Sequence, residues 1–471
     1  MPHMMVSTGR ALIHSGAGDN YYVDATAGND ANSGRSPGAP WQTIAKVNAT
    51  TFRPGDSVLF KRGETWVGVN LIISSSGTGS APITFGAYGT GADPIIDGND
   101  LADCISANAR NYLRFENIEC TQGLDFGFSF SGCTGLTMIG CVSHDCGNDA
   151  VIFASGCSYC TVLGGSFHDS YGRVGGTTNT GIEINDGSHH ITIDGVTCYG
   201  SLVGGQGIGI FSHAATVMPY NITIKDCTCY NNAQMGIYIL KADAAADTDR
   251  NITITDCTCY DNTLDGFYLY NTGAEYLDGV TVDSCISRSN DRRALYMRGD
   301  NITIQRTVLA TDVNQYPIYI VDSEALTFYN VTIYATAAFV GFTGMVVITG
   351  ARMDTFLMKD CIVEAESTNP YMIQILAGTG VANFDIDYNL YGYTGVANRW
   401  DWLGVVKSWA NWLADTGMDA SSPAPADPAF TNPGANDWTL QVGSPAINVG
   451  VDVGLPYCGA APDCGAYEYC P

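Results

Sequence analysis

Acidic residues stand at related positions in two neighbouring segments that share one strand pattern. Asp149 comes just before an apolar strand, and Glu183 lies inside the corresponding strand of the next repeat. In a parallel sheet with strands about 4.8 Å apart and a rise of about 3.3 Å per residue, this offset places their Cα atoms roughly 8 Å apart. Carboxyl groups about 5–10 Å apart can act as acid and base, or as acid and nucleophile, on a glycosidic bond. Asp186, which ends the strand of Glu183, is a third candidate.

Histidines gather in the same part of the chain. Five of the seven lie between positions 144 and 213, namely His144, His168, His189, His190 and His213. The pairs His144-Asp145 and His168-Asp169 occupy equal positions in neighbouring repeats, so their rings are expected to stack. Both pairs lead into the loops before the two carboxyl groups, and Arg173 lies on the longer loop. Ionisable side chains that converge on three coils indicate a site, whereas each residue alone could hold a turn or be solvated.

A repeated strand pattern positions these residues. Its copies follow one another at intervals of 22 to 31 residues, which suits one turn of a three-stranded coil with variable loops. The first and third residues of each copy are apolar and point inward, and the fifth is often Gly, Asp or Asn, which tolerate the left-handed backbone of a tight corner. The copies begin at Leu113, Leu136, Cys160, Ile191, Ile222, Ile252, Val280, Ile302, Leu326 and Phe356. Stacked coils of this kind bury one continuous core, so we predict an all-β fold, a single right-handed parallel β-helix of about ten or more three-stranded coils.

A second strand, often opened by Gly, follows the variable loop of each repeat, and its outward positions form two rows along the coil axis. The mid-strand row passes from Glu183 through Gly209 to tyrosines on consecutive coils, Tyr238, Tyr268, Tyr296 and Tyr319. The row before the Gly position contains Asp149, Thr180, Gln206, Met235, Asp265 and Arg293. Exposed aromatic rings on such a sheet can stack on sugar rings; the alternative is that a long loop covers them.

The 17 cysteines fit the same repeat. Their odd number, in a chain large enough for its own core, gives little support to a disulfide framework. Most share inward positions six and eight of the pattern, so we interpret them as stacked thiols that act as small apolar residues. These are Cys141, Cys227, Cys257, Cys285 and Cys361 at position six and Cys120, Cys198, Cys229 and Cys259 at position eight. A disulfide among Cys458, Cys464 and Cys470, outside the ladder, is left open.

The composition limits the kinds of partner that the protein can bind. A net charge of −26 repels nucleic acid and anionic membranes, and no run of eighteen apolar residues predicts a membrane span.

Residues 1–20 are interpreted as a tag-bearing, disordered leader without a signal peptide, and residues 21–399 as the β-helix with a helical N-terminal cap at Trp41–Asn48. Residues 400–471 are interpreted as a C-terminal tail packed on the β-helix, with a helix over Trp400–Leu413.

Segments at both ends carry a resemblance to a known family. They are Tyr21-Tyr-Val-Asp-Ala, Gly28-Asn-Asp, Pro54-Gly-Asp and Gly86-Ala-Tyr-Gly near the start, and Asp427-Pro-Ala-Phe, Gly443-Ser-Pro-Ala-Ile and Gly465-Ala-Tyr-Glu468 near the end. Together with the repeat, they resemble the pectate-lyase-like β-helix superfamily, which contains polysaccharide lyases, glycoside hydrolases, epimerases, tailspikes and adhesins. The resemblance implies this fold, a polysaccharide partner and an extracellular, secreted protein. It does not choose the activity, because the end motifs are structural.

We favour a secreted glycan-active enzyme that hydrolyses glycosidic bonds. Asp149 and Glu183 would share the acid and base or nucleophile roles, with Asp186 or His168 assisting. The expected substrate-binding residues are His144, Arg173, Gln206, His213, Tyr238, Tyr268, Tyr296, Arg293 and Arg298.

Two other classes remain open. A polysaccharide lyase would use Arg293 or Arg298 as the base, since Arg293-x4-Arg298-Gly resembles the spacing of pectate lyases. Leu295 and Met297 point inward, however, which puts the motif one step out of register, and Asp265 is expected to pair with Arg293. Lyases of the superfamily often use Ca²⁺, but no Asp-rich calcium cluster stands beside Arg293, and we assign no metal ligands. The third class is a non-enzymatic tailspike, adhesin or carbohydrate-binding solenoid. The sugar, the linkage and the oligomeric state are left open.

Overall fold

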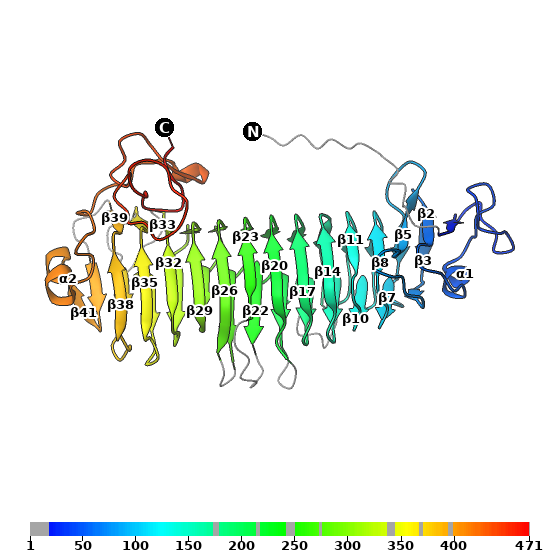
Figure 1. The fold of residues 1–471 in the computed structure, drawn as a ribbon, viewed down its shortest axis with the longest axis horizontal. Helices are drawn as coiled ribbons and strands as arrows, with labels where there is room; N and C mark the ends of the chain where they lie inside the picture. The colour runs from blue at the N-terminus through cyan, green and yellow to red at the C-terminus, as the bar shows by residue number, and fades with distance from the viewer. Residues whose placement is uncertain are drawn as a thin grey trace.

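The computed structural model describes residues 18–172, 179–212, 217–241, 250–272, 276–336, 344–366, 371–393 and 399–470. Three long sheets run side by side along one axis, and each coil adds one strand to each sheet (Figure 1). Every pairing along these sheets is parallel except the last one, between β40 and β41. The predicted all-β fold of stacked three-stranded coils is confirmed.

The first sheet contains the repeated strand that the sequence pattern predicts. Its strands are β1 (Asn20–Val23), β2 (Ser57–Lys61), β5 (Ile83–Tyr88), β8 (Leu113–Glu116), β11 (Thr137–Ile139), β14 (Ser158–Leu163), β17 (His189–Asp194), β20 (Tyr220–Lys225), β23 (Ile252–Thr255), β26 (Leu277–Asp283), β29 (Gly299–Gln305), β32 (Leu326–Tyr329), β35 (Thr355–Lys359) and β38 (Asn383–Asp387). The corner after this sheet has a left-handed backbone, with φ of 56° at Gly140 and 53° at both Asp226 and Asp256. The expectation for position five is therefore confirmed.

The second sheet consists of the short strands that follow this corner. They are β3 (Thr65–Val67), β6 (Ile95–Asp97), β9 (Glu119–Thr121), β12 (Val142–His144), β15 (Ser166–His168), β18 (Thr197–Tyr199), β21 (Thr228–Tyr230), β24 (Thr258–Tyr260), β27 (Ile286–Arg288), β30 (Val308–Thr311), β33 (Thr332–Ala335), β36 (Ile362–Ala365) and β39 (Leu390–Tyr393).

The third sheet holds the strands that the sequence shows opening with Gly. They are β4 (Leu71–Ile73), β7 (Ile105–Asn108), β10 (Phe128–Ser131), β13 (Val151–Ala154), β16 (Asn179–Asn185), β19 (Gly205–Phe211), β22 (Ile237–Lys241), β25 (Asp265–Asn271), β28 (Arg293–Met297), β31 (Ile318–Val321), β34 (Gly344–Thr349), β37 (Tyr371–Ile375), β40 (Arg399–Trp402) and β41 (Val405–Lys407).

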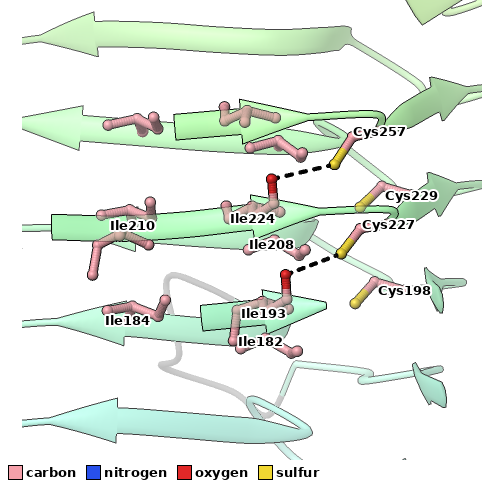
Figure 2. Packing of buried hydrophobic residues seen from close by; sticks show 14 of the residues in the cluster. Ile182, Ile184, Ile193, Cys198, Ile208, Ile210, Ile224, Cys227, Cys229 and Cys257 are labelled. Atoms are coloured by element: carbon pink, nitrogen blue, oxygen red, sulfur yellow. Dashed lines mark hydrogen bonds between the residues drawn. The ribbon is translucent and has the colours of Figure 1, made fainter. Parts of the chain in front are cut away.

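Isoleucines and cysteines from the three sheets fill the interior (Figure 2). Every cysteine predicted at positions six and eight is buried with a free thiol, so the interpretation of the cysteines as core residues is confirmed. The thiols of Cys227 and Cys257 donate to backbone carbonyls of the preceding coil, at 3.7 Å. A Cβ added to Gly181 would lie 3.0 Å from the sulfur of Cys198, and one added to Gly236 would lie 2.7 Å from that of Cys259. Glycine opens the third-sheet strands because the sulfur column occupies this corner.

Short helices cover the two ends of the coil (Figure 1). The helix α1 (Ile44–Asn48) lies within the predicted N-terminal cap, and its N-cap residue Thr43 accepts a hydrogen bond from the backbone N–H of Lys46. At the other end, the helix α2 (Trp409–Thr416) buries Trp412. The expected helix over Trp400–Leu413 was wrong in its first half, because Arg399–Trp402 forms β40 and extends the third sheet by pairing with β37.

The C-terminal segment folds back along the second sheet (Figure 1). It contains β42 (Phe430–Asn432), a 3₁₀ turn at Pro433–Ala435 and β43 (Asp437–Leu440). Phe430 and Trp438 pack on the ring of Tyr334, with centroids 6.2 and 6.1 Å away. A disulfide joins Cys458 to Cys470, while Cys464 is a buried free thiol. None of the helices in the described ranges is long and apolar enough to cross a membrane.

Candidate functional site

The predicted acidic residues meet on the outer side of the third sheet. The mid-strand row has the predicted register, in which Glu183 pairs with Ile152 on one side and with Gly209 on the other. Asp149 precedes β13 by two residues. The backbone N–H of Thr180, on the strand of Glu183, donates to Asp149 Oδ1 at 2.8 Å. The two carboxyl groups therefore belong to adjacent coils, as the sequence predicts.

The surroundings of Asp149 favour its protonated form. Only 2% of the residue is exposed. Burial and the negative charge of Glu183 together raise the pKa of Asp149 well above its usual range, although the hydrogen bonds from Thr180 oppose the shift. A carboxyl group that keeps its proton near neutral pH can act as a general acid.

Glu183 is more enclosed than the sequence predicted. We expected an outward side chain in a groove, but the residue is only 4% exposed, and every residue of β16 and β19 is buried. Phe211 contributes to this cover, because its ring lies over Gly209, the neighbour of Glu183, where an added Cβ would be 2.3 Å from a ring atom. The side-chain amide of Asn185 donates to Glu183 Oε1. Glu183 is thus buried next to the position that the Phe211 ring covers, and the amide of Asn185 orients it.

A chain of side-chain hydrogen bonds leads away from this pair. The Thr180 hydroxyl donates to Gln206 Oε1 at 3.1 Å, and Gln206 Nε2 donates to Gln234 Oε1 at 3.0 Å. Gln206 is 2% exposed, so it fixes this face from within. Thr180, Asn185 and Phe211 were not expected to have a role at this site. Strand alternation could have found Asn185 and Phe211, because residues two apart on a strand share a face.

Asp186 lies at the turn that ends β16. Its φ of 49° is left-handed, and its backbone carbonyl accepts the N–H of Gly156 at 3.0 Å. The side chain is half-buried. This position beyond the end of the strand separates Asp186 from Asp149, which lies before the start of the neighbouring strand.

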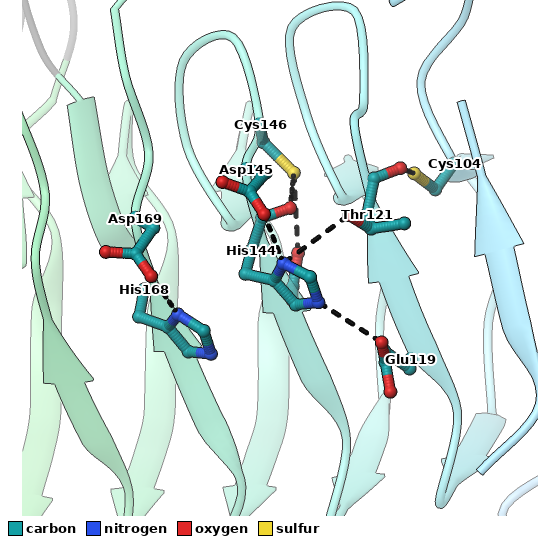
Figure 3. A network of polar contacts seen from close by, with 9 residues as sticks. Cys104, Glu119, Thr121, His144, Asp145, Cys146, His168 and Asp169 are labelled. Carbon is teal, nitrogen blue, oxygen red and sulfur yellow. Dashed lines mark hydrogen bonds and ion pairs between the residues drawn. The ribbon is translucent and has the colours of Figure 1, made fainter. Parts of the chain in front are cut away.

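His144 and His168 end β12 and β15 of the second sheet, outside the third-sheet row that contains Glu183, whereas His189 and His190 open β17 of the first sheet. His168 Nδ1 is 2.8 Å from Asp169, and its ring stacks on that of His144 with centroids 5.0 Å apart (Figure 3). Burial lowers the pKa of His144, but Asp145 and Glu119 raise it further, so the net shift is upward. The expected stacking is confirmed.

The stack continues beyond the histidines. The rings follow one another from His168 to Tyr199, Tyr230 and Tyr260, at 4.4 to 5.0 Å, and the guanidinium of Arg288 lies over the last ring. This regular column can stabilise the second sheet without any catalytic role.

Tyrosines continue the mid-strand row on the third sheet. Tyr268 stacks on Tyr296 with centroids 4.6 Å apart, and Tyr296 stacks on Tyr319 at 5.8 Å, while Tyr238 meets Tyr268 edge to face. All four are partly exposed. This part of the row can present aromatic surface to a sugar.

Asp265 and Arg293 lie beside the tyrosine row in the predicted pairing. They occupy paired positions of β25 and β28 with the charged atoms 3.9 Å apart. Asp265 is fully buried, and neither of its carboxylate oxygens has a hydrogen-bond partner among the described residues. Burial raises the pKa of Asp265 to about 6, although Arg293 and Arg292 oppose the shift. Arg293 also packs on the rings of Tyr296 and Tyr319.

The remaining predicted site residues are placed elsewhere or cannot be described. Arg298 donates to the backbone carbonyl of Asn271 at 3.2 Å and lies over the rings of Tyr270 and Tyr276. Arg173 and His213 lie outside the described residues. Within the parts of the chain that the structure describes, no group of three or more His, Cys, Asp or Glu side chains is arranged to hold a metal ion.

Comparisons with known proteins agree with the fold. A family model described as a right handed beta helix region matches residues 180–389. A pectate lyase of known structure is 17% identical, with a TM-score of 0.49 and 96% of each chain covered. The predicted right-handed parallel β-helix is confirmed.

Local similarity also links the chain to two longer proteins. A lacto-N-biosidase of Bifidobacterium longum is 41% identical over 90 residues, which are 18% of this chain and 6% of that protein. An alpha-1,3-galactosidase A of Akkermansia muciniphila is 28% identical over 109 residues, which are 21% of this chain and 18% of that protein. The matched part is thus a small fraction of each relative.

Proposed function

We propose that this pectate-lyase-like β-helix is a glycan-active enzyme that hydrolyses glycosidic bonds with Asp149 and Glu183. The observation that carries the proposal is the placement of two buried carboxyl groups on adjacent coils, where burial and the charge of Glu183 both raise the pKa of Asp149. Placing two like charges side by side destabilises a fold, and such pairs are concentrated at active sites.

The two carboxyl groups have environments that suit different roles. Asp149, with its raised pKa, donates its proton to the glycosidic oxygen as the bond to the leaving sugar breaks. Glu183, oriented by Asn185, acts as the ionised partner, either as the base that activates water or as the nucleophile. The N–H of Thr180 holds Asp149 in place at the start of β16. Asp186 and His168 are assigned no direct step in this scheme.

The rest of the row supplies binding surface. A glycan that lies along the coil axis would pass from Glu183 over Phe211 to Tyr238 and Tyr268, because these residues follow one another on paired strands. The names of the two local relatives, a lacto-N-biosidase and an alpha-1,3-galactosidase, support a carbohydrate substrate and favour hydrolysis over elimination. We assign sugar contacts to the tyrosines. His144 lies on the second sheet and is given no contact, and Arg173 and His213 lie outside the described residues.

We propose that this enzyme acts outside the cell. The Cys458–Cys470 disulfide supports this location, since disulfides persist mainly in oxidising compartments. The net charge of −26 favours neutral glycans over polyanionic ones.

A panel of oligosaccharides and polysaccharides tests the proposal, with new reducing ends as the measure of hydrolysis. Glu183→Gln and Asp149→Asn should each lower kcat by about 100-fold to 10,000-fold, whereas Asp312→Asn, an exposed control, should match the parent. Full activity in Glu183→Gln would remove the carboxyl pair from the mechanism. Retention of a glycan by the parent without any cleavage would instead support the binding-solenoid class.

Elimination at Arg293 is the second candidate, because one observation favours it. Burial lowers the pKa of Arg293, although Asp265 opposes the shift, and a lyase needs a base of this kind. A lyase would form unsaturated uronates that absorb in the ultraviolet, and Arg293→Ala would abolish them while Glu183→Gln would not. Loss of that activity on treatment with a chelator would add Ca²⁺ to the mechanism.

A further inference from the structure

A hollow of about 510 Å³ lies between the second sheet and the folded-back C-terminal segment. Glu364 and Glu366 reach it from the end of β36, and Asp427, Phe430 and Gln441 reach it from the C-terminal segment. None of the described residues that line it carries a positive charge. The hollow is on another sheet from Asp149 and Glu183, so it is independent of the proposed hydrolytic site.

Glu364 is the most unusual residue of this hollow. It is only 8% exposed, and its Oε2 atom has no hydrogen-bond partner in the described part of the chain. Burial, followed by the negative charges of Asp427 and Glu366, raises the pKa of Glu364 to about 8. A buried carboxyl oxygen without a partner is costly, and here it faces a space large enough for a small molecule.

The other two acids of the hollow are held by local contacts. The Tyr334 hydroxyl donates to Glu366 Oε1, and Asp427 Oδ1 accepts the backbone N–H of Ala429 at 2.8 Å. These contacts hold both side chains in place. A cation bound in the hollow would face the unpartnered oxygen of Glu364, with Glu366 and Asp427 beside it.

We propose that this hollow binds a small organic cation, a primary ammonium on a hydroxyl-bearing body of about monosaccharide size. The ammonium donates to the unpartnered oxygen of Glu364 and lies between the charges of Glu366 and Asp427. The polar side chain of Gln441 and the apolar ring of Phe430 then face the body of the ligand.

Size distinguishes this ligand from a metal ion. The volume falls within the roughly 300–1,000 Å³ that is typical of small-molecule pockets. A bound Ca²⁺ would need six to eight oxygen atoms at about 2.3–2.6 Å. In the described part of the chain, however, no group of three or more Asp, Glu, His or Cys side chains is arranged to hold a metal ion.

Isothermal titration calorimetry of the full chain with glucosamine tests the proposal, with N-acetylglucosamine as the neutral control and CaCl₂ as the metal control. We expect saturable binding of glucosamine alone. Glu364→Gln should weaken it roughly tenfold or more, because one charge-assisted hydrogen bond is lost, and Asp312→Asn should leave it unchanged. Binding should also release a proton near pH 7, detected as a dependence of the heat on the buffer, because the ammonium favours the ionised form of Glu364.

Three outcomes would overturn the proposal. They are equal binding of N-acetylglucosamine, competition by CaCl₂ at lower concentration than glucosamine, and unchanged glucosamine affinity in Glu364→Gln. If Glu364→Gln does not fold, Asp427→Asn takes its place, and unchanged affinity in that variant likewise counts against the proposal. Activity in the oligosaccharide panel is not used here, so failure of this proposal leaves the hydrolytic one standing.

Discussion

Asp149 and Asp265 occupy the same row of the same sheet, but their neighbours differ in charge. Asp265 faces Arg293 on the adjacent strand, and its pKa rises only to about 6. Asp149 accepts a hydrogen bond from Thr180 on the adjacent strand, and burial, followed by the charge of Glu183, raises its pKa well above the usual range. Burial is the largest cause of both pKa shifts, and the neighbouring charge adds to it at Asp149 but opposes it at Asp265. A compensated acid can serve structure, whereas an uncompensated pair is retained at a stability cost and indicates chemistry.

Removal of one member of the uncompensated pair should have the largest effect on activity. Glu183→Gln should lower kcat about 100-fold or more while the melting temperature stays the same or rises, because the repulsion between the two carboxyl groups is gone. Asp265→Asn is the matched change in the compensated pair and should keep most of the activity. Equal losses in both variants would contradict the comparison.

Removal of the compensating cation should have the largest effect on stability. Arg293→Met leaves the buried Asp265 with only the more exposed Arg292, 3.9 Å away, as a counter-charge. We expect a loss of up to about 3–5 kcal/mol in the free energy of unfolding, measured by urea denaturation. The double variant with Asp265→Asn should recover most of this loss. A double variant as unstable as Arg293→Met would mean that packing on Tyr296 and Tyr319, rather than charge, is what Arg293 supplies.

Acid pH should stabilise the protein, because several carboxyl groups have raised pKa values in the folded state. Asp360 has a pKa of about 7, for which burial is the largest cause, and Glu364 has one of about 8. The folded chain therefore binds more protons than the unfolded chain between about pH 4 and pH 8, and stability falls as the pH rises through this window. Melting temperatures at pH 5 and pH 8 measure the effect, which should shrink in Glu364→Gln. A higher melting temperature at pH 8 would contradict it.

The tyrosine half of the row should contribute binding and little chemistry. Tyr268→Ala should raise KM by about threefold to tenfold, which corresponds to the loss of one aromatic contact, and should leave kcat within a factor of two or so. Tyr260→Ala removes a ring of the second-sheet column and serves as the control. A large fall in kcat for Tyr268→Ala would place the chemistry nearer to Asp265 and Arg293.

Those parts of the structure that depend on the repeat could be predicted from the sequence. Inward and outward positions, the left-handed corner at Asp226 and Asp256 and the register of Glu183 beside Gly209 all follow from a period shared by every coil. The burial of the cysteines follows from the same period.

Features that depend on a single side chain could not be predicted. Glu183 was expected at the surface, but the residue is only 4% exposed, and the strand pattern does not predict that the Phe211 ring covers the neighbouring Gly209. Trp400 belongs to β40 because β37 offers an edge to pair with, although the tryptophan spacing favours a helix. The hollow at Glu364 depends on where the C-terminal segment folds back, which the strand pattern does not specify.

The protonation state of Asp149 at neutral pH tests the central claim most directly. Difference infrared spectra of the carboxyl band, between the parent and Asp149→Asn, would report it, and the same pair of spectra in a Glu183→Gln background would report the influence of Glu183. We predict a protonated Asp149 at pH 7 that becomes easier to ionise once Glu183 is replaced. An ionised Asp149 at pH 7, or a titration that does not change in the Glu183→Gln background, would contradict the account.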